Sequence, residues 1–225
     1  MFSSIAKRYD LLNHTLSLNI DRRWRAFAAR EVCPPPGAPI LDCCTGTADL
    51  AIALDRQARG ANPVVGVDFT PELLRIGQAK VRKLGASDRI RLAQGDAMRL
   101  PFPKDSFATV TVAFGLRNVS DTVQGLDELI RVARLGGKVA ILEFSKPTAP
   151  MLRQCYWLFF QRILPKIGQT VAPNAHSAYE YLPQSVAEFP DGQAMLDLMA
   201  ARGLTDLKRF PLTAGIATLY VGTKA

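Results

Sequence analysis

The most informative segment of this chain is Ile40-Leu41-Asp42-Cys43-Cys44-Thr45-Gly46-Thr47-Ala48-Asp49. Its first half is an apolar run of strand length. Its second half is a turn of small residues, followed by a helical pattern that continues to about Ala58. Small residues allow the backbone of such a turn to come close to a ligand. We therefore predict a buried strand, a ligand-facing turn and a helix, in that order.

The same alternation continues along the chain. Further strands are predicted at residues 64–67, 89–93, 107–114 and 138–144, with helices from Thr70 and from about Asp121 to Ala133. Leu135-Gly136-Gly137 is expected to end the second of these helices. Two closing strands are predicted at residues 204–210 and 215–222. The pattern is typical of an α/β fold with a doubly wound, seven-stranded, mostly parallel sheet.

We predict one domain over residues 1–225, divided into four parts. Residues 1–36 would form a helical N-terminal flap, 37–147 a cofactor-binding core, 148–200 a helical substrate cover and 201–225 the closing strands. The cover includes the apolar stretch from Met151 to Leu164, which either packs on the sheet or lines a route for an apolar chain.

Composition places the chain among folded proteins. It has 225 residues, of which 48% are hydrophobic and 21% charged, so it is long enough to bury a core and is not expected to be disordered. No apolar run approaches the ~20 residues of a membrane span. The N-terminus lacks the features of a signal peptide, so we expect a cytoplasmic protein, with contact at the inner face of the membrane as an alternative.

The net charge of +8 favours anionic partners: nucleic acid, an acidic membrane surface or a charged ligand. A solvated basic surface explains the same charge equally well.

Few residues are available for metal or hydrolytic chemistry. Only two histidines occur, His14 and His176, so a His-rich metal site is excluded and no metal is expected. The absence of a G-x-S-x-G motif disfavours a hydrolase. The four cysteines, with no C-x-x-C pair, are predicted to be reduced thiols.

Candidate ligand-binding residues follow three successive predicted strands. The first strand carries Asp42 and leads into the turn with Gly46; the second ends at Asp68, next to Phe69; the third is followed by Asp96. The carboxyl ends of parallel strands form the ligand-binding edge of such a sheet. Asp68 can accept hydrogen bonds from a ribose diol, Phe69 can stack on adenine, and Asp96 can accept from an amine.

These residues indicate a site for an adenosine-containing cofactor. The chain has no G-x-x-x-x-G-K-[ST] motif, and the turn after the first strand is not G-x-G-x-x-G, so phosphate-bearing nucleotides fit poorly. S-adenosylmethionine is the adenosine cofactor that fits best.

Further blocks carry a resemblance to a known family, among them residues 9–13 (YDLLN), 21–25 (DRRWR), 114–121 (FGLRNVSD), 142–147 (LEFSKP) and 179–185 (YEYLPQS). With them the chain resembles class I S-adenosylmethionine-dependent methyltransferases, and among these the C-methyltransferases of menaquinone and ubiquinone biosynthesis. The resemblance extends over nearly the whole chain. It implies methyl transfer to a ring carbon of a prenylated quinol, with demethylmenaquinol as the preferred substrate.

The resemblance also implies cofactor contacts for Thr47, Asp68, Asp96 and Ala97. Where the family usually has a serine this chain has Ala113, which leaves a backbone contact. Two usual glycines of the turn are Thr45 and Ala48 here. Their side chains are expected to crowd the methionine portion of the cofactor unless the turn adjusts.

Candidate catalytic residues follow the fourth strand. Arg117 is expected to stabilise a developing phenolate or to orient a water, Asn118 to hold a ring hydroxyl, and Tyr9 to position the ring. The competing interpretation of Arg117 is a structural ion pair with Asp121.

Several alternatives stay open at this point. They are a benzoquinol of ubiquinone biosynthesis, another small apolar acceptor, an RNA base, or a scaffold that binds the cofactor without catalysis. Nucleic acid is not expected as a partner, because no appended RNA-binding module is found. A homodimer and transient contact with an anionic membrane are further alternatives.

Overall fold

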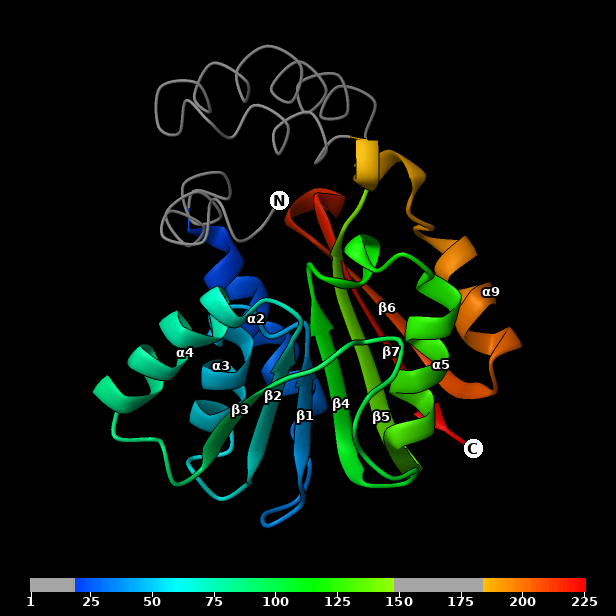
Figure 1. Ribbon diagram of the computed structural model, residues 1–225. Helices are drawn as coiled ribbons and strands as arrows, with labels where there is room; N and C mark the ends of the chain where they lie inside the picture. The colour runs from blue at the N-terminus through cyan, green and yellow to red at the C-terminus, as the bar shows by residue number, and fades with distance from the viewer. Residues whose placement is uncertain (1–18, 148–183) are drawn as a thin grey trace, which may run out of the picture.

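The computed structural model describes residues 19–147 and 184–225. These residues form a seven-stranded sheet in the order β3-β2-β1-β4-β5-β7-β6 (Figure 1). The strands are β1 (Ile40–Cys43), β2 (Val64–Asp68), β3 (Ile90–Gln94), β4 (Phe107–Ala113), β5 (Ala133–Phe144), β6 (Leu204–Leu212) and β7 (Ala217–Lys224). Neighbours from β3 to β5 pair in parallel, and β7 pairs antiparallel with both β5 and β6. The predicted fold class is confirmed.

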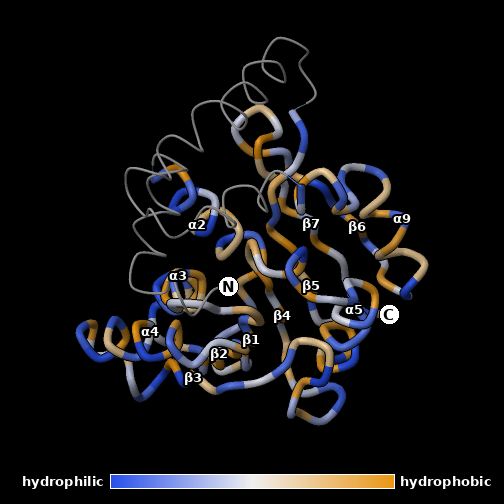
Figure 2. The backbone as a smooth tube through the Cα atoms, turned by 45° about the horizontal axis from the view of Figure 1, so that its top comes forward, coloured by the Kyte–Doolittle hydropathy of each residue, from blue (hydrophilic) through white to orange (hydrophobic). Residues whose placement is uncertain are grey.

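Helices cover both faces of the sheet. On one face lie α2 (Ile20–Val32), α3 (Asp49–Gln57) and α4 (Pro71–Lys83), and on the other lie α5 (Thr122–Val132) and α9 (Gln193–Ala201) (Figure 1). Two short 3₁₀ turns, η1 (Leu116–Asn118) and η3 (Thr213–Gly215), lie among them. Along α3 and α4 hydrophobic and hydrophilic residues alternate, as expected for helices with one buried side (Figure 2).

Side chains of the strands contribute to two hydrophobic cores, one on each face of the sheet. Ile40 of β1 packs with α2 and α3, whereas Leu41 and Cys43 pack with α5 and α9. This alternation follows from the period of two in a strand. A strand that is covered on both faces is therefore apolar at nearly every position, which is why the pattern in the sequence was a continuous apolar run.

Local signals explain the starts of α4 and α5. Pro71 occupies the first turn of α4, where its missing N–H is not needed. The carboxylate of Asp121 accepts from the backbone N–H of Gln124 at 2.9 Å and caps α5.

One predicted boundary was wrong. Helix α5 ends at Val132, and β5 begins at Ala133 rather than Lys138, so Gly136 and Gly137 lie within the strand. Gly136 has φ = +72°, and the pairing of β4 with β5 shifts register next to these glycines. A glycine pair at an irregularity in a strand is therefore the correct interpretation of the sequence signal.

The segment after β4 lies against the turn after β1. A Cβ atom added to Gly115 would lie 2.3 Å from the Cβ of Cys44, and Cys44 itself has φ = +53°. Gly115 therefore lets the two strand ends approach each other.

We expect Gly115→Ala to destabilise the protein by about 2 kcal/mol, because overpacking against a constrained backbone is not relieved by a rotamer change. The additional change Cys44→Gly removes the clashing Cβ and should restore most of the loss. Urea unfolding of the wild type, both single variants and the double variant measures this. Equal destabilisation of Gly115→Ala with and without Cys44→Gly would contradict the explanation.

Candidate active site

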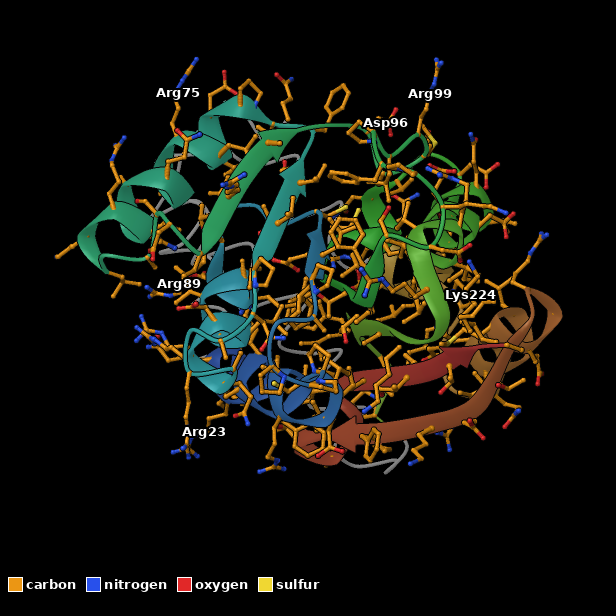
Figure 3. All side chains as sticks on the ribbon, turned by 90° about the horizontal axis from the view of Figure 1, so that it is seen from below. Arg23, Arg75, Arg89, Asp96, Arg99 and Lys224 are labelled. Atoms are coloured by element: carbon orange, nitrogen blue, oxygen red, sulfur yellow. The ribbon has the colours of Figure 1, made fainter. Side chains whose placement is uncertain are left out.

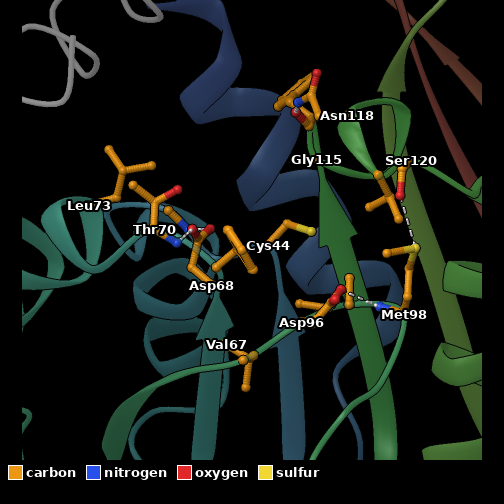
Figure 4. Close-up of a pocket in the computed structure, with 17 residues that line it drawn as sticks. Cys44, Val67, Asp68, Thr70, Leu73, Asp96, Met98, Gly115, Asn118 and Ser120 are labelled. Atoms are coloured by element: carbon orange, nitrogen blue, oxygen red, sulfur yellow. Dashed lines mark hydrogen bonds between the residues drawn. The ribbon is translucent and has the colours of Figure 1, made fainter. Parts of the chain in front are cut away.

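A cavity of about 340 Å³ lies at the carboxyl edge of the sheet. In Figure 4 it opens between Asp68 and Thr70 on one side and Gly115, Asn118 and Ser120 on the other. The lining residues are Cys43, Cys44, Gly46, Val67, Asp68, Phe69, Thr70, Leu73, Gly95, Asp96, Ala97, Met98, Phe114, Gly115, Asn118, Val119 and Ser120. Gly46, Asp68, Phe69, Asp96 and Ala97, all predicted from the sequence, therefore share one cavity.

Asp68 is a polar group of this cavity that two backbone donors hold in place. One of its carboxylate oxygens accepts from the N–H of Gly46 and the other from the N–H of Thr70, each at 2.8 Å. Burial raises the pKa of Asp68, and the two backbone donors oppose that shift. Each oxygen keeps a lone pair, so the carboxylate can still accept hydrogen bonds from a diol.

The neighbouring residues suit a planar base. The side chain of Phe69 is 71% exposed, which is unusual for a large apolar residue, and it lines the cavity. Asp96 and Ala97 line the same cavity, where Asp96 accepts from the N–H of Met98 at 2.9 Å and Ala97 is buried. The cavity therefore offers both an aromatic ring and a carboxylate to a planar base.

The turn after β1 has an unusual backbone. Cys44, Gly46 and Ala48 all have positive φ, at 53°, 56° and 69°. Left-handed non-glycine residues are strained and cluster at functional sites. The Cβ of Ala48 faces α4, where a Cβ added to Gly77 would lie 3.2 Å from it. Thr45 directs its hydroxyl to Asp42 at 2.6 Å.

A second cavity, of about 30 Å³, adjoins the first. It is lined by Asp42, Thr47 and Ala113, which the sequence predicted as cofactor-binding, and by Arg25, Cys44, Thr45, Gly46, Asp49, Leu50 and Phe114. The hydroxyl of Thr47 accepts from the ammonium of Lys80 at 2.9 Å. The predicted cofactor residues are thus divided between two cavities that share Gly46.

Asp42 is fully buried in the wall of the smaller cavity. Its carboxylate accepts from the hydroxyls of Thr45 at 2.6 Å and Thr111 at 3.1 Å. Burial raises its pKa from 3.8 to about 6, although these hydrogen bonds and the charge of Arg25 oppose the shift.

Cys44 lies where the two cavities meet. A hydrogen bond with Cys43, together with burial, raises the pKa of the Cys44 thiol well above its ordinary value. Its sulfur is therefore a neutral lining group at neutral pH rather than a nucleophile.

The two predicted catalytic residues of η1 have different surroundings. Asn118 lines the larger cavity; its amide nitrogen donates to the carbonyl of Phe114 at 3.3 Å, and its buried Oδ1 has no partner among the described residues. The guanidinium of Arg117 lies 2.7 Å from the carboxylate of Glu143 and 5.3 Å from the ring centre of Phe144. Tyr9 lies outside the described residues.

The ion pair considered for Arg117 was assigned to the wrong partner. Asp121 caps α5, whereas Glu143, which is fully buried on β5, pairs with the guanidinium. Glu143 also accepts from the backbone N–H groups of Arg117 at 3.4 Å and Phe144 at 3.2 Å. Both residues belong to the two family blocks in the sequence, but only the parallel pairing of β4 and β5 brings the blocks together.

Sequence reasoning missed several residues of the site. Met98 and Val119 line the larger cavity, and the aromatic rings of Trp24, Phe114 and Phe144 form a cluster beside the smaller one, with centroid separations from 4.6 to 6.2 Å. Phe144 lay in a predicted strand and Trp24 in the predicted N-terminal helical segment, and both belong to blocks that carry the family resemblance. No local pattern, however, indicated that their rings would lie together beside the turn after β1.

Among residues 19–147 and 184–225, no group of three or more His, Cys, Asp or Glu side chains is arranged so that it could hold a metal ion. In the same part of the chain no helix is long and apolar enough to cross a membrane.

The fold, with the site at the carboxyl ends of β1, β2 and β3, is that of a Rossmann-like α/β protein. Among solved structures, an S-adenosylmethionine-dependent methyltransferase from Thermotoga maritima is similar over 100% of this chain and 98% of its own, with a TM-score of 0.69 and 16% identity. The [4+2]-cyclase SpnF is similar over 90% of this chain and 80% of its own, with a TM-score of 0.66 and 17% identity, so this likeness describes the fold alone.

The sequence comparison is more specific. Residues 1–224 match the model of the ubiE/COQ5 methyltransferase family, and the chain belongs to this family. It is 47% identical to the ubiquinone/menaquinone biosynthesis C-methyltransferase UbiE of Geobacter sp. (strain M21), over 100% of this chain and 94% of that protein. It is 43% identical to the demethylmenaquinone methyltransferase of Thermus thermophilus, over the full length of both. The protein is therefore an enzyme, a methyltransferase, as predicted.

The raised pKa of Asp42 predicts a pH dependence of stability. In the folded protein Asp42 holds its proton up to about pH 6, whereas in the unfolded chain it loses the proton near 4. Between these values the native state binds more protons, so this residue makes stability fall as the pH rises. Asp42→Asn removes the titrating group, and its amide can still accept from Thr45 and donate to Thr111.

We expect the stability of the wild type relative to Asp42→Asn to fall by an amount on the order of 3 kcal/mol between about pH 4 and pH 7. Urea unfolding followed by tryptophan fluorescence, at several pH values in this range, measures the difference. Parallel stability curves for the two proteins would contradict the assignment.

Proposed function

We propose that this enzyme transfers the methyl group of S-adenosylmethionine to a ring carbon of a prenylated quinol, with demethylmenaquinol as the preferred acceptor. The observation that carries the proposal is the position of Asp68. It is a buried carboxylate held by two backbone donors beside an exposed phenylalanine, at the edge of an open cavity. Relatives named UbiE and demethylmenaquinone methyltransferase support the choice of acceptor.

The residues present fit the cofactor. Asp68 would accept from the ribose hydroxyls, Phe69 would contact the adenine ring, and Asp96 with Ala97 would lie along the edge of the base. Thr47, Asp42 and the backbone at Ala113 line the smaller cavity next to them. When bound, S-adenosylmethionine supplies a methyl group that is already activated by the sulfonium.

The remaining catalytic work concerns the acceptor. A quinol carbon becomes nucleophilic when a neighbouring hydroxyl loses its proton, so the protein must align the ring and stabilise the resulting phenolate. Asn118 Oδ1 is a buried acceptor without a partner among the described residues, and a ring hydroxyl is the donor it would accept from.

Arg117 would supply positive charge to the phenolate or hold the water that takes the proton. The ion pair with Glu143 holds the guanidinium of Arg117 in place, directly before Asn118 in the chain. The Nε of Arg117 is buried and has no partner among the described residues. Such a donor is available for an oxyanion or for a water.

We expect Arg117→Ala to lower turnover by about 100-fold or more while cofactor affinity changes little, because its charge acts on the acceptor. Arg117→Lys should retain part of the activity. Since Arg117→Ala leaves Glu143 buried and unpaired, the double variant Arg117→Ala, Glu143→Gln is the matched control for folding. Full turnover in the stably folded variants would contradict a catalytic role.

The acceptor is tested with methyl-labelled S-adenosylmethionine and two reduced substrates, demethylmenaquinol and the demethylated precursor of ubiquinol. We expect label in the naphthoquinol, detected by mass spectrometry. Label in the benzoquinol alone would move the assignment to ubiquinone biosynthesis. Label in neither, with cofactor binding intact, would favour another small apolar acceptor, whereas no cofactor binding would favour a scaffold.

The net charge of +8 predicts that the protein contacts an anionic membrane, and this remains a prediction. Arg23 on α2 and Arg75 on α4 point away from the protein in Figure 3. Exposed arginines of this kind can approach the surface of a bilayer that contains the prenylated substrate.

A further inference from the structure

We infer that Arg25, on α2, binds the carboxylate of the methionine portion of the cofactor. This inference rests on the proposed function, because it names the group that holds one end of S-adenosylmethionine.

The first observation is the connection between the two cavities. Both are lined by Cys44, Gly46 and Phe114, so they meet at the turn after β1. The larger cavity contains the residues suited to adenosine, namely Asp68, Phe69 and Asp96. A cofactor whose adenosine lies there has its amino-acid end directed across Gly46 into the smaller cavity.

The second observation is the charge of the smaller cavity. Arg25 is the only basic residue among those lining it, and two acids, Asp42 and Asp49, line it as well. Methionine ends in a zwitterion, with one carboxylate and one ammonium group. Among the residues that line the smaller cavity, the guanidinium of Arg25 is the group that can pair with the carboxylate.

The third observation is the support of the guanidinium. Arg25 pairs with Asp21 one turn earlier on α2, and its side chain is only 11% exposed. The guanidinium carbon lies 5.2 Å from the centre of the Phe114 ring. Asp21 is the only acceptor of Arg25 within the described residues, so the remaining N–H groups of its planar fork are available for a carboxylate.

Other cations near the turn are less suitable. The ammonium of Lys80 donates to Thr47 and pairs with Asp49 at 2.8 Å, and Lys80 does not line the smaller cavity. Arg22 and Arg23 precede Arg25 on the same helix but are exposed. Figure 3 shows Arg23 pointing away from the protein, which makes it a control of the same residue type on the same element.

The test compares S-adenosylmethionine with decarboxylated S-adenosylmethionine, which keeps the ammonium and the sulfonium but lacks the carboxylate. Dissociation constants of both ligands are measured by calorimetry for the wild type, Arg25→Ala and Arg23→Ala. Because Arg25→Ala removes a charge-assisted hydrogen bond, we expect it to weaken S-adenosylmethionine binding by roughly 10- to 100-fold. Binding of the decarboxylated ligand should change by less than about threefold, and Arg23→Ala should leave both constants unchanged.

A second variant separates a loss of carboxylate binding from a folding defect. Asp21→Asn with Arg25→Gln removes both charges of the pair, so no carboxylate is left unpaired, and it should show the same selective loss. Equal losses for the two ligands, or no loss for either, would overturn the assignment of Arg25. A wild type that binds neither ligand would overturn the proposed function itself, and the role of Arg25 with it.

Discussion

The hydrogen bond from the N–H of Gly46 to the carboxylate of Asp68 organises the rest of the site. It joins the turn after β1 to the end of β2, and Asp68 then also accepts from Thr70 at the start of α4. Because β1 and β2 pair in parallel, their carboxyl ends meet at one edge, and a single carboxylate can span both. This connection holds the left-handed turn before α3 against the end of β2, at the wall of the larger cavity.

Buried charge is the main cost of this arrangement. Asp42 and Glu143 are fully buried, and each is satisfied by several donors: hydroxyls for Asp42, and a guanidinium with two backbone N–H groups for Glu143. Isolated buried carboxylates are strongly destabilising. Asp42 lines the smaller cavity and Glu143 holds Arg117, so both carboxylates order residues of the candidate site.

Much of the fold was predictable because each element carried its own signal. Apolar runs marked the strands, Pro71 and Asp121 marked helix starts, and the acids at strand ends marked the edge where ligands bind. The boundary of β5 was not predictable in this way. A pair of glycines is compatible both with the end of a helix and with an irregularity within a strand. Only the pairing with β4 shows that Gly136 and Gly137 belong to a strand.

The candidate site was predictable where its residues follow strands directly, as for Asp68, Phe69 and Asp96. Residues brought in by packing were not. Arg25 reaches the smaller cavity because α2 lies against α3, and Glu143 reaches Arg117 because β5 lies beside β4. Those contacts join residues far apart in the chain, for which no local pattern exists.

The sequence by itself thus determined the order of strands and helices, the edge of the sheet where the candidate site lies and the family of the protein, because periodicity, turn chemistry and motifs are local. Only the tertiary structure decided which charges pair, how the predicted cofactor-binding residues divide between two cavities and which arginine lines the smaller one. Those outcomes depend on distances across the sheet, and a linear order of residues contains no distances.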